Sequence, residues 1–108
     1  MKTLTFSYNF NNKLSCRAFT TLRLADESRF KIGNQFLVAD KKTEYGLFEV
    51  RDVKTLRLED INAWISYIDT GYDQTTCKEM IRTMYKAKQI DWSTQLLNFV
   101  LLVKIKEN

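Results

Sequence analysis

The feature of this sequence that most constrains its fold is the apolar run near its end. Residues 94–105 leave almost no polar face, because leucine, valine, isoleucine and phenylalanine occupy most positions. Such a run is typical of a strand covered on both sides, or of a central strand in a closed sheet. The chain has no proline, so each strand can donate its full ladder of backbone hydrogen bonds. The sequence therefore predicts a sheet with this strand inside it.

Earlier strands are predicted from residues that alternate between apolar and polar. In residues 3–10, aromatic and aliphatic side chains occupy every second position, which is the pattern of a half-buried strand. Residues 16–23 favour a second strand because they combine threonine with aromatic and aliphatic residues. Residues 36–39 and 45–53 read as the two arms of a hairpin, joined by a short cationic turn.

The period changes to that of a helix in the second half of the chain. Leucine and isoleucine recur at three- and four-residue steps over residues 58–68, which predicts one helix with a single apolar stripe. Gly71 is placed to end this helix in the left-handed conformation. A second helix is predicted to begin near Thr75 or Thr76, since Thr76 and Glu79 have the spacing of a capping box.

This order of elements predicts the fold class. We expect an α+β protein: a small β-barrel of about five or six strands, with two consecutive helices inserted before the last strand. With 108 residues, of which 44% are hydrophobic, there is room for one packed core, so residues 1–108 are expected to form a single domain. No stretch has the pattern of a signal peptide or a spanning helix, so we expect a cytoplasmic protein without membrane association.

Composition excludes several classes of chemistry. The chain has no histidine, and its two cysteines, Cys16 and Cys77, lie far apart. These facts argue against most zinc sites and against every serine–histidine or cysteine–histidine dyad, and we expect neither a metal nor a cofactor. The formal net charge of +4 attracts polyanions only weakly, because acidic residues are interspersed among the basic ones. Nucleic acid is permitted as a partner but not required.

Three polar residues of the predicted second strand form the first candidate site. Alternation along residues 16–23 would place Arg17, Thr21 and Arg23 on one face. Arginine offers a forked pair of donors and threonine a hydroxyl, which together suit a phosphate or the edge of a base. The alternative is an ordinary solvated face of a strand.

Asp69 is the second candidate. An acid in the last turn of a helix faces the negative end of the macrodipole, which costs about 0.3–1 kcal/mol when the acid is exposed. A placement that defies a local preference suggests a functional role. Alternatively, Asp69 bonds a backbone N–H in the turn or pairs with an arginine. Tyr72 follows the glycine cap and is the aromatic residue best placed to stack on a base, whereas Trp64 and Tyr85 are expected in the core.

A secondary basic face is predicted on the second helix. Lys78, Arg82 and Lys86 recur at four-residue steps, and like charges so spaced repel by a few tenths of a kcal/mol, about 0.2–0.5 per pair, which a polyanion would relieve. A solvated basic face explains the same pattern, and Glu79 offsets part of the repulsion.

Several short motifs, taken in order, resemble the ASCH domain of the PUA-like superfamily. They are Arg17-x-x-x-Thr21-x-Arg23, Phe-Lys-Ile-Gly-Asn at residues 30–34, Asp-Thr-Gly-Tyr at residues 69–72, and the closing strand, so the resemblance spans most of the chain. The resemblance implies a PUA-like barrel that binds RNA or nucleotides. It also implies that the strand with Thr21 borders the ligand cleft and that residues 69–72 close over it.

A subset of ASCH proteins removes the acyl group from N-acylated cytidine, and the resemblance implies the residues involved. These enzymes use a lysine three residues before a threonine, together with a glutamate in the helical region. Here Thr21 is kept and Asp69 stands for the glutamate, but Ala18 occupies the lysine position. Threonine is a poor nucleophile unless a neighbour takes its proton, and the adjacent Arg17 cannot do so. Unless another lysine reaches the site, the sequence predicts no catalytic residues.

The sequence therefore predicts a binding module first. RNA or a modified nucleotide would lie between the strand that ends at Arg23 and the turn at Asp69 and Tyr72. Arg17 and Arg23 would contact phosphate or base, Thr21 would bond the base, and Asp69 would accept from an exocyclic amine. The amidohydrolase is the second possibility, and a protein-interaction domain with a vestigial cleft is the third.

Overall fold

The computed structural model describes residues 2–106 and shows an α+β fold built on one curved sheet. Within that range five strands lie in the spatial order β1-β3-β4-β5-β2. In chain order the elements are β1 (Thr3–Thr5), the 3-10 helix η1 (Phe10–Ser15), β2 (Ala18–Leu24), β3 (Gln35–Ala39), β4 (Glu44–Arg57), the 3-10 helix η2 (Leu58–Asp60), α1 (Ala63–Thr70), α2 (Gln74–Met84) and β5 (Leu96–Lys106).

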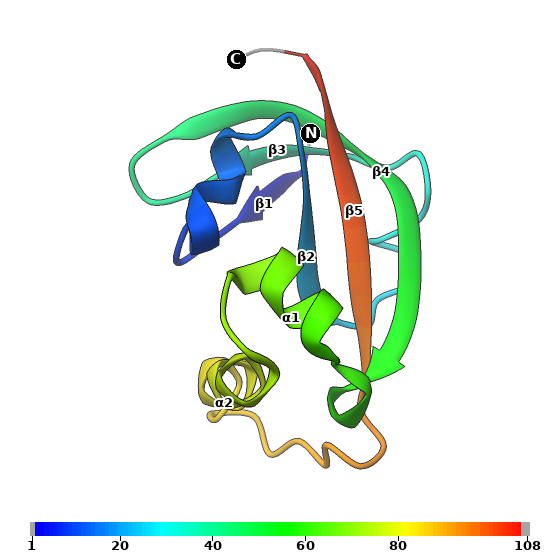
Figure 1. The fold of residues 1–108 in the computed structure, drawn as a ribbon. Helices are drawn as coiled ribbons and strands as arrows, with labels where there is room; N and C mark the ends of the chain where they lie inside the picture. The colour runs from blue at the N-terminus through cyan, green and yellow to red at the C-terminus, as the bar shows by residue number, and fades with distance from the viewer. Residues whose placement is uncertain (1, 107–108) are drawn as a thin grey trace.

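The sheet is mixed and bent into half of a barrel. β1 pairs with β3 in parallel, whereas β3 with β4, β4 with β5, and β5 with β2 pair antiparallel. Figure 1 shows the long β4 curving around the molecule, with α1 lying across β2 and β5 in this view. The predicted α+β class, with two consecutive helices before the last strand, is confirmed. Within the described residues, no helix has the length and apolarity needed to cross a bilayer.

The closing strand lies inside the sheet, as its apolar run predicts. β5 is hydrogen-bonded to β2 on one side and to β4 on the other. Val100 and Leu102 are completely buried. Leu101 points to the opposite face and keeps 37% of its surface exposed, so that face of β5 is only partly covered.

Two apolar clusters form the core, and β2 contributes to both. The first cluster fills the half-barrel around Phe19, Phe36 and Phe48. The second packs beneath the helices and includes Leu22 and Ile81. Because Phe19 and Leu22 point to opposite faces of the same strand, the middle of β2 lies where the two clusters meet.

The first strand is shorter than predicted. β1 ends at Thr5, whose partner Ala39 is the last residue of β3, so the strand loses its only neighbour there. The chain then turns through Asn11 and Asn12, which both adopt positive φ angles of 56° and 54°. Asparagine tolerates this region better than most residues. The predicted strand over residues 3–10 is therefore wrong beyond Thr5.

The first predicted helix is divided into two. Residues 58–60 form η2, and α1 begins only at Ala63, where the Asn62 side chain accepts a hydrogen bond from the backbone N–H of Ile65 at 3.0 Å. Gly71 ends α1 with φ +80°, as predicted, and its N–H donates to the Tyr67 carbonyl at 2.9 Å.

The second helix begins slightly earlier than predicted. Asp73 is its N-cap and accepts from the backbone N–H of Thr76 at 2.7 Å. The proposed capping box of Thr76 and Glu79 is therefore wrong, because Thr76 already lies in the first turn of α2.

Helix α1 has its polar face turned inward. Ser66, Asp69 and Thr70 are buried, whereas Trp64 is 77% exposed. The expectation that Trp64 lies in the core is wrong, because the short α1 presents polar groups to β2 and directs the tryptophan outward. A helix that buries its polar side points to a polar site beneath it.

Candidate functional site

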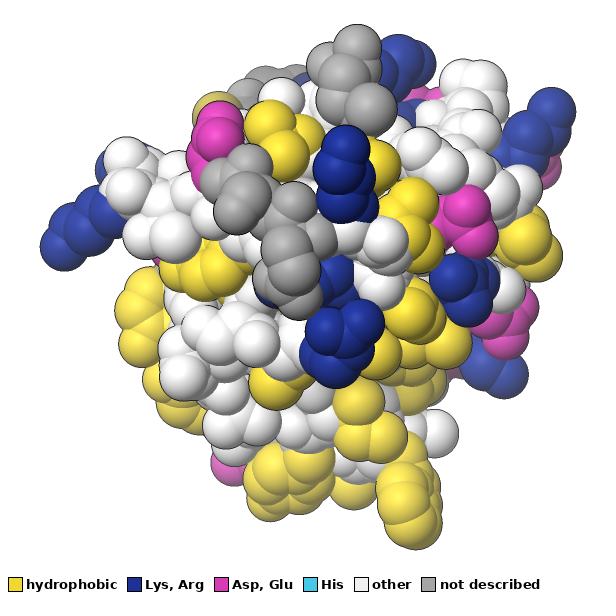
Figure 2. All heavy atoms as spheres, turned by 90° about the horizontal axis from the view of Figure 1, so that it is seen from above, with side chains coloured by type: hydrophobic (Ala, Val, Ile, Leu, Met, Phe, Trp, Pro, Cys, Tyr) yellow, Lys and Arg dark blue, Asp and Glu magenta, His cyan; other side chains and the backbone are white. Residues whose placement is uncertain are grey.

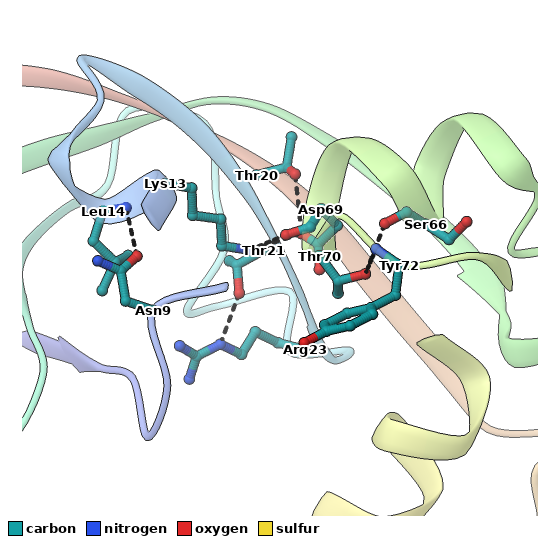
Figure 3. Close-up of polar contacts among 10 residues, drawn as sticks. All are labelled: Asn9, Lys13, Leu14, Thr20, Thr21, Arg23, Ser66, Asp69, Thr70 and Tyr72. Carbon is teal, nitrogen blue, oxygen red and sulfur yellow. Dashed lines mark hydrogen bonds and ion pairs between the residues drawn. The ribbon is translucent and has the colours of Figure 1, made fainter. Parts of the chain in front are cut away.

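Asp69 is the centre of a buried polar cluster at the end of α1. Only 4% of its surface is exposed. Its Oδ1 atom accepts from Thr20 Oγ1 at 2.9 Å and from Lys13 Nζ at 3.2 Å. Lys13 Nζ also donates to the main-chain carbonyl of Asp69 at 2.7 Å. As Figure 3 shows, η1, β2 and α1 thus meet at one carboxylate.

Lys13 explains how an acid can occupy the last turn of α1. The carbonyl end of a helix disfavours a carboxylate and attracts a cation. The Lys13 ammonium lies against both the carboxylate and the main-chain carbonyl of Asp69, near the end of the helix. The sequence suggested an arginine or a backbone N–H as the partner of Asp69, whereas the structure supplies this lysine.

The turn that follows α1 is fixed by close packing against η1. A Cβ atom on Gly71 would lie 3.3 Å from Cγ of Asn11, and its φ of +80° already favours glycine. Thr70 Oγ1 donates to the Ser66 carbonyl at 2.8 Å and accepts from the N–H of Tyr72 at 3.1 Å. The C-terminal end of α1 therefore packs closely against η1, the element that carries Lys13.

Burial shifts the pKa of both Asp69 and Lys13 toward the neutral form of each group. It raises the pKa of the Asp69 carboxyl, while the Lys13 charge and the Thr20 hydroxyl act in the opposite direction. Burial likewise lowers the pKa of the Lys13 amine, against the attraction of Asp69. For each group, desolvation outweighs the attraction of the partner. The neutral form of each group is therefore more favoured in the protein than it is in water. A proton can pass between the two groups more readily than between an exposed lysine and an exposed aspartate.

Arg23 is a second ordered cation nearby. Its Nε donates to Thr21 Oγ1 at 3.1 Å, and its Nη2 donates to the Thr5 carbonyl at 2.9 Å. The guanidinium carbon lies 4.5 Å from the centre of the Phe6 ring. Burial lowers the pKa of Arg23, but a guanidinium stays charged near neutral pH. These contacts use two of its five N–H groups and leave the others able to meet a ligand.

Lys13, Asp69, Thr21 and Arg23 border one cavity of about 230 Å³. The rest of its wall is mostly apolar. The segment that leads into η1 contributes the aromatic residues Phe6, Tyr8 and Phe10, and α2 contributes Met80, Ile81 and Met84. A concave, largely apolar space with a few convergent polar groups is the usual form of a small-molecule site.

Thr21, Arg23 and Asp69, three of the five residues predicted from the sequence for the ligand site, line this cavity. Tyr72 lies near its edge, 42% exposed, with its ring 6.4 Å from that of Phe10 in an edge-to-face contact. Arg17 is exposed and does not line the cavity, because it precedes the first residue of β2 and lies away from the Arg23 end.

In the predicted secondary basic face, Arg82 and Lys86 are exposed and Lys78 is half-buried, and Lys78 and Arg82 already have partners. Lys78 Nζ lies 3.4 Å from the Glu59 carbonyl, and Arg82 pairs with Glu79 at 3.0 Å. Lys86 lies beyond the end of α2. On the face seen in Figure 2, basic side chains are likewise separated by apolar and acidic ones.

Sequence reasoning missed Lys13 and Thr20. Lys13 lies in a 3-10 helix without any apolar period, so no pattern marks it as buried. Alternation along the strand places Thr20 on the face opposite Thr21, away from the residues chosen for the ligand site. Thr20 and Thr21 nevertheless both belong to the site, because β2 is an edge strand and α1 packs beside it. Asp69 accepts a hydrogen bond from Thr20, while Thr21 lines the cavity.

Comparisons of the chain with protein-family models, with curated proteins and with solved structures find no match. Among residues 2–106, no three acidic or sulfur side chains are grouped so that they could hold a metal ion. The cavity beside Asp69 is the feature of the molecule from which a function can be inferred.

Proposed function

We propose that this protein is a nucleotide-binding module of the ASCH type, which holds one base of an RNA or of a modified nucleotide in the cavity beside Asp69. One observation carries the proposal. Thr21, Arg23 and Asp69, chosen from the sequence as ligand contacts, line the same cavity although Asp69 is far from the other two in the chain.

The inner end of the cavity suits the edge of a base. Asp69 offers an acceptor and Lys13 offers a donor next to it, and the edge of a base presents donors and acceptors side by side. The aromatic rings of Tyr8 and Phe10 provide surfaces on which the base can stack, which contributes about 1–3 kcal/mol per base.

Arg23 suits the phosphate or sugar of the same nucleotide. Its guanidinium is held in place by Thr21 and Thr5, so little side-chain entropy is lost when it binds an anion. Tyr72 lies near the cavity with part of its ring exposed, where it can stack on a neighbouring base.

The test is the affinity for the common ribonucleoside monophosphates and for short single-stranded RNA, measured by calorimetry. Arg23→Gln should weaken binding by about 1.5–3 kcal/mol, the usual worth of a hydrogen bond to a charged group. Arg51→Gln is the matched control, since Arg51 is exposed and pairs with Glu49 on β4. Equal affinity of the Arg23→Gln variant and the wild type, or no binding by the wild type, would rule the proposal out.

A second candidate is removal of the acyl group from N-acylated cytidine, and Lys13 is the observation that favours it. The sequence disfavoured this activity because Ala18 stands where the enzymes have lysine. Lys13 reaches the same cavity from η1 and lies beside Thr21 and Asp69 (Figure 3). A desolvated lysine amine can take the proton of a threonine hydroxyl.

Turnover of N-acetylcytidine, followed by chromatography, tests this candidate separately from binding. Lys13→Arg and Thr21→Val should each abolish turnover, because the first removes the base and the second removes the hydroxyl. An inactive wild-type protein that still binds nucleotides would eliminate the enzyme and leave the binding module.

A further inference from the structure

Lys13 presents a primary amine to the wall of an apolar cavity. Its side chain is 7% exposed, and Nζ lies 6.0 Å from the centres of both the Phe6 and the Phe10 rings. A lysine amine in desolvated surroundings is a better nucleophile than one in water, because more of it is uncharged. The nucleotide-binding proposal uses Lys13 only as a hydrogen-bond donor.

Arg23 provides an independent observation about the kind of ligand. It borders the same cavity and is oriented by its bonds to Thr21 and Thr5. A guanidinium held in this way suits a carboxylate or phosphate, which it binds with two parallel hydrogen bonds. A ligand that used both residues would carry an anionic group and would place its next atoms toward Lys13.

We propose that Lys13 forms an imine with a small carbonyl compound that carries an anionic group, such as a 2-oxo acid. The anion would pair with Arg23, and the carbonyl carbon would lie against Lys13 Nζ. The proposal depends on the cavity, on Lys13 and Arg23, and on Asp69 beside Lys13, and it goes beyond nucleotide binding.

Asp69 supplies the proton transfers that this reaction needs. Its carboxylate first accepts a proton from the Lys13 ammonium, and the free amine then forms a C–N bond with the carbonyl carbon. The carbonyl oxygen gains a proton as the nitrogen loses one, which gives a carbinolamine. The Asp69 carboxyl then protonates the hydroxyl, which leaves as water when the C=N bond forms. One ammonium and one carbonyl thus give one protonated imine and one water, and Asp69 is again a carboxylate, with no oxidant or reductant.

The test traps the imine in the full-length protein. The protein is incubated near neutral pH with pyruvate and sodium cyanoborohydride, which delivers hydride to the C=N carbon and leaves a stable secondary amine. Peptide mass spectrometry then gives the rate of labelling at each lysine. Lys41 and Lys42, exposed between β3 and β4, are internal controls in the same sample.

We expect Lys13 to be labelled on the order of tenfold faster than Lys41 and Lys42, which corresponds to about 1.4 kcal/mol in activation free energy. Acetone, which has the same ketone without the carboxylate, should label Lys13 more slowly than pyruvate, and Arg23→Gln should remove that difference. Labelling of Lys13 no faster than of the two exposed lysines would overturn the proposal.

The outcome is separable from that of nucleotide binding. Rapid labelling of Lys13 in a protein that binds no nucleotide would support the imine and reject the binding module. Nucleotide binding without selective labelling would do the reverse. The comparison uses the wild-type chain, so it does not depend on whether a Lys13 variant folds.

Discussion

Lys13 and Asp69 lie 56 positions apart in the sequence, yet Lys13 Nζ contacts both the carboxylate and the main-chain carbonyl of Asp69, at 3.2 and 2.7 Å. The pair joins η1 to the end of α1 and forms one side of the cavity. Because both groups are buried, each depends on the other for compensation of its charge. Stability and ligand binding should therefore be linked at this pair.

Removal of one partner should be strongly destabilising. Lys13→Met leaves the Asp69 carboxylate buried with Thr20 as its remaining side-chain donor among the described residues. Loss of one member of a buried ion pair costs about 3–5 kcal/mol. The double variant Lys13→Met/Asp69→Asn should lose less than the sum of the two single variants, because no uncompensated charge remains. Urea unfolding of the four proteins measures this coupling, and strictly additive losses would contradict it.

The same pair predicts a minimum in the pH dependence of stability. Burial raises the pKa of Asp69 above its ordinary value of 3.8, so the folded state binds more protons and the free energy of unfolding falls as pH rises through that window. Burial lowers the pKa of Lys13 below 10.5, so the unfolded state binds more protons and the free energy of unfolding rises again toward 10.5.

Comparison with the double variant isolates this effect. The free energy of unfolding of the wild type, minus that of Lys13→Met/Asp69→Asn, should be lowest at intermediate pH. A difference that stays constant over the whole range would show that neither pKa is shifted by folding.

Asp73 should have the opposite effect to Asp69 at acid pH, so that the free energy of unfolding rises with pH. The backbone N–H of Thr76 lowers the pKa of this N-cap carboxyl below 3.8. A depressed pKa gives stabilisation that is present above 3.8 and is lost as pH falls through the folded value. In thermal melts at neutral pH, the melting temperature of the wild type should be higher than that of Asp73→Asn, because asparagine caps the helix without a negative charge. The gap should close in acid, and a gap that persisted there would contradict the assignment.

Gly71→Ala should impair both stability and binding. Its φ of +80° costs an alanine about 1–2 kcal/mol, and the new Cβ would lie 3.3 Å from Asn11, close to Lys13 in η1. Gly33→Ala is a suitable control, because Gly33 also has a positive φ, +96°, but nothing lies within 4 Å of the added atom. Chemical denaturation should show a lower free energy of unfolding for both variants, whereas calorimetry should show weaker nucleotide binding only for Gly71→Ala.

Much of the fold could be predicted because its causes are local in the sequence. The apolar run that becomes β5, the change of period before α1, and the left-handed Gly71 each mark an element by themselves. The end of β1 could not be predicted in this way. It depends on where β3 stops, and pairing between distant segments leaves no mark on residues 6–10.

The site was predictable in part for the same reason. Asp69 drew attention because a carboxylate at the end of a helix opposes the helix dipole. Lys13, which resolves that conflict, comes from a distant turn without periodicity, so only the tertiary structure reveals it. The exposed Trp64 has a related cause, since the polar site lies on the side of α1 where an apolar stripe was expected.

The most direct test of the account locates bound nucleotide on the protein. Amide resonances of isotope-labelled wild-type protein are followed by NMR while a ribonucleoside monophosphate is added, with each common base in turn. We predict the largest shifts at Lys13, in the stretch from Thr20 to Arg23, and around Asp69, with the exposed Lys41 and Lys42, which do not line the cavity, unaffected. Shifts confined to residues outside the cavity wall, or no shifts with any of the nucleotides, would contradict the claim that this cavity is the binding site.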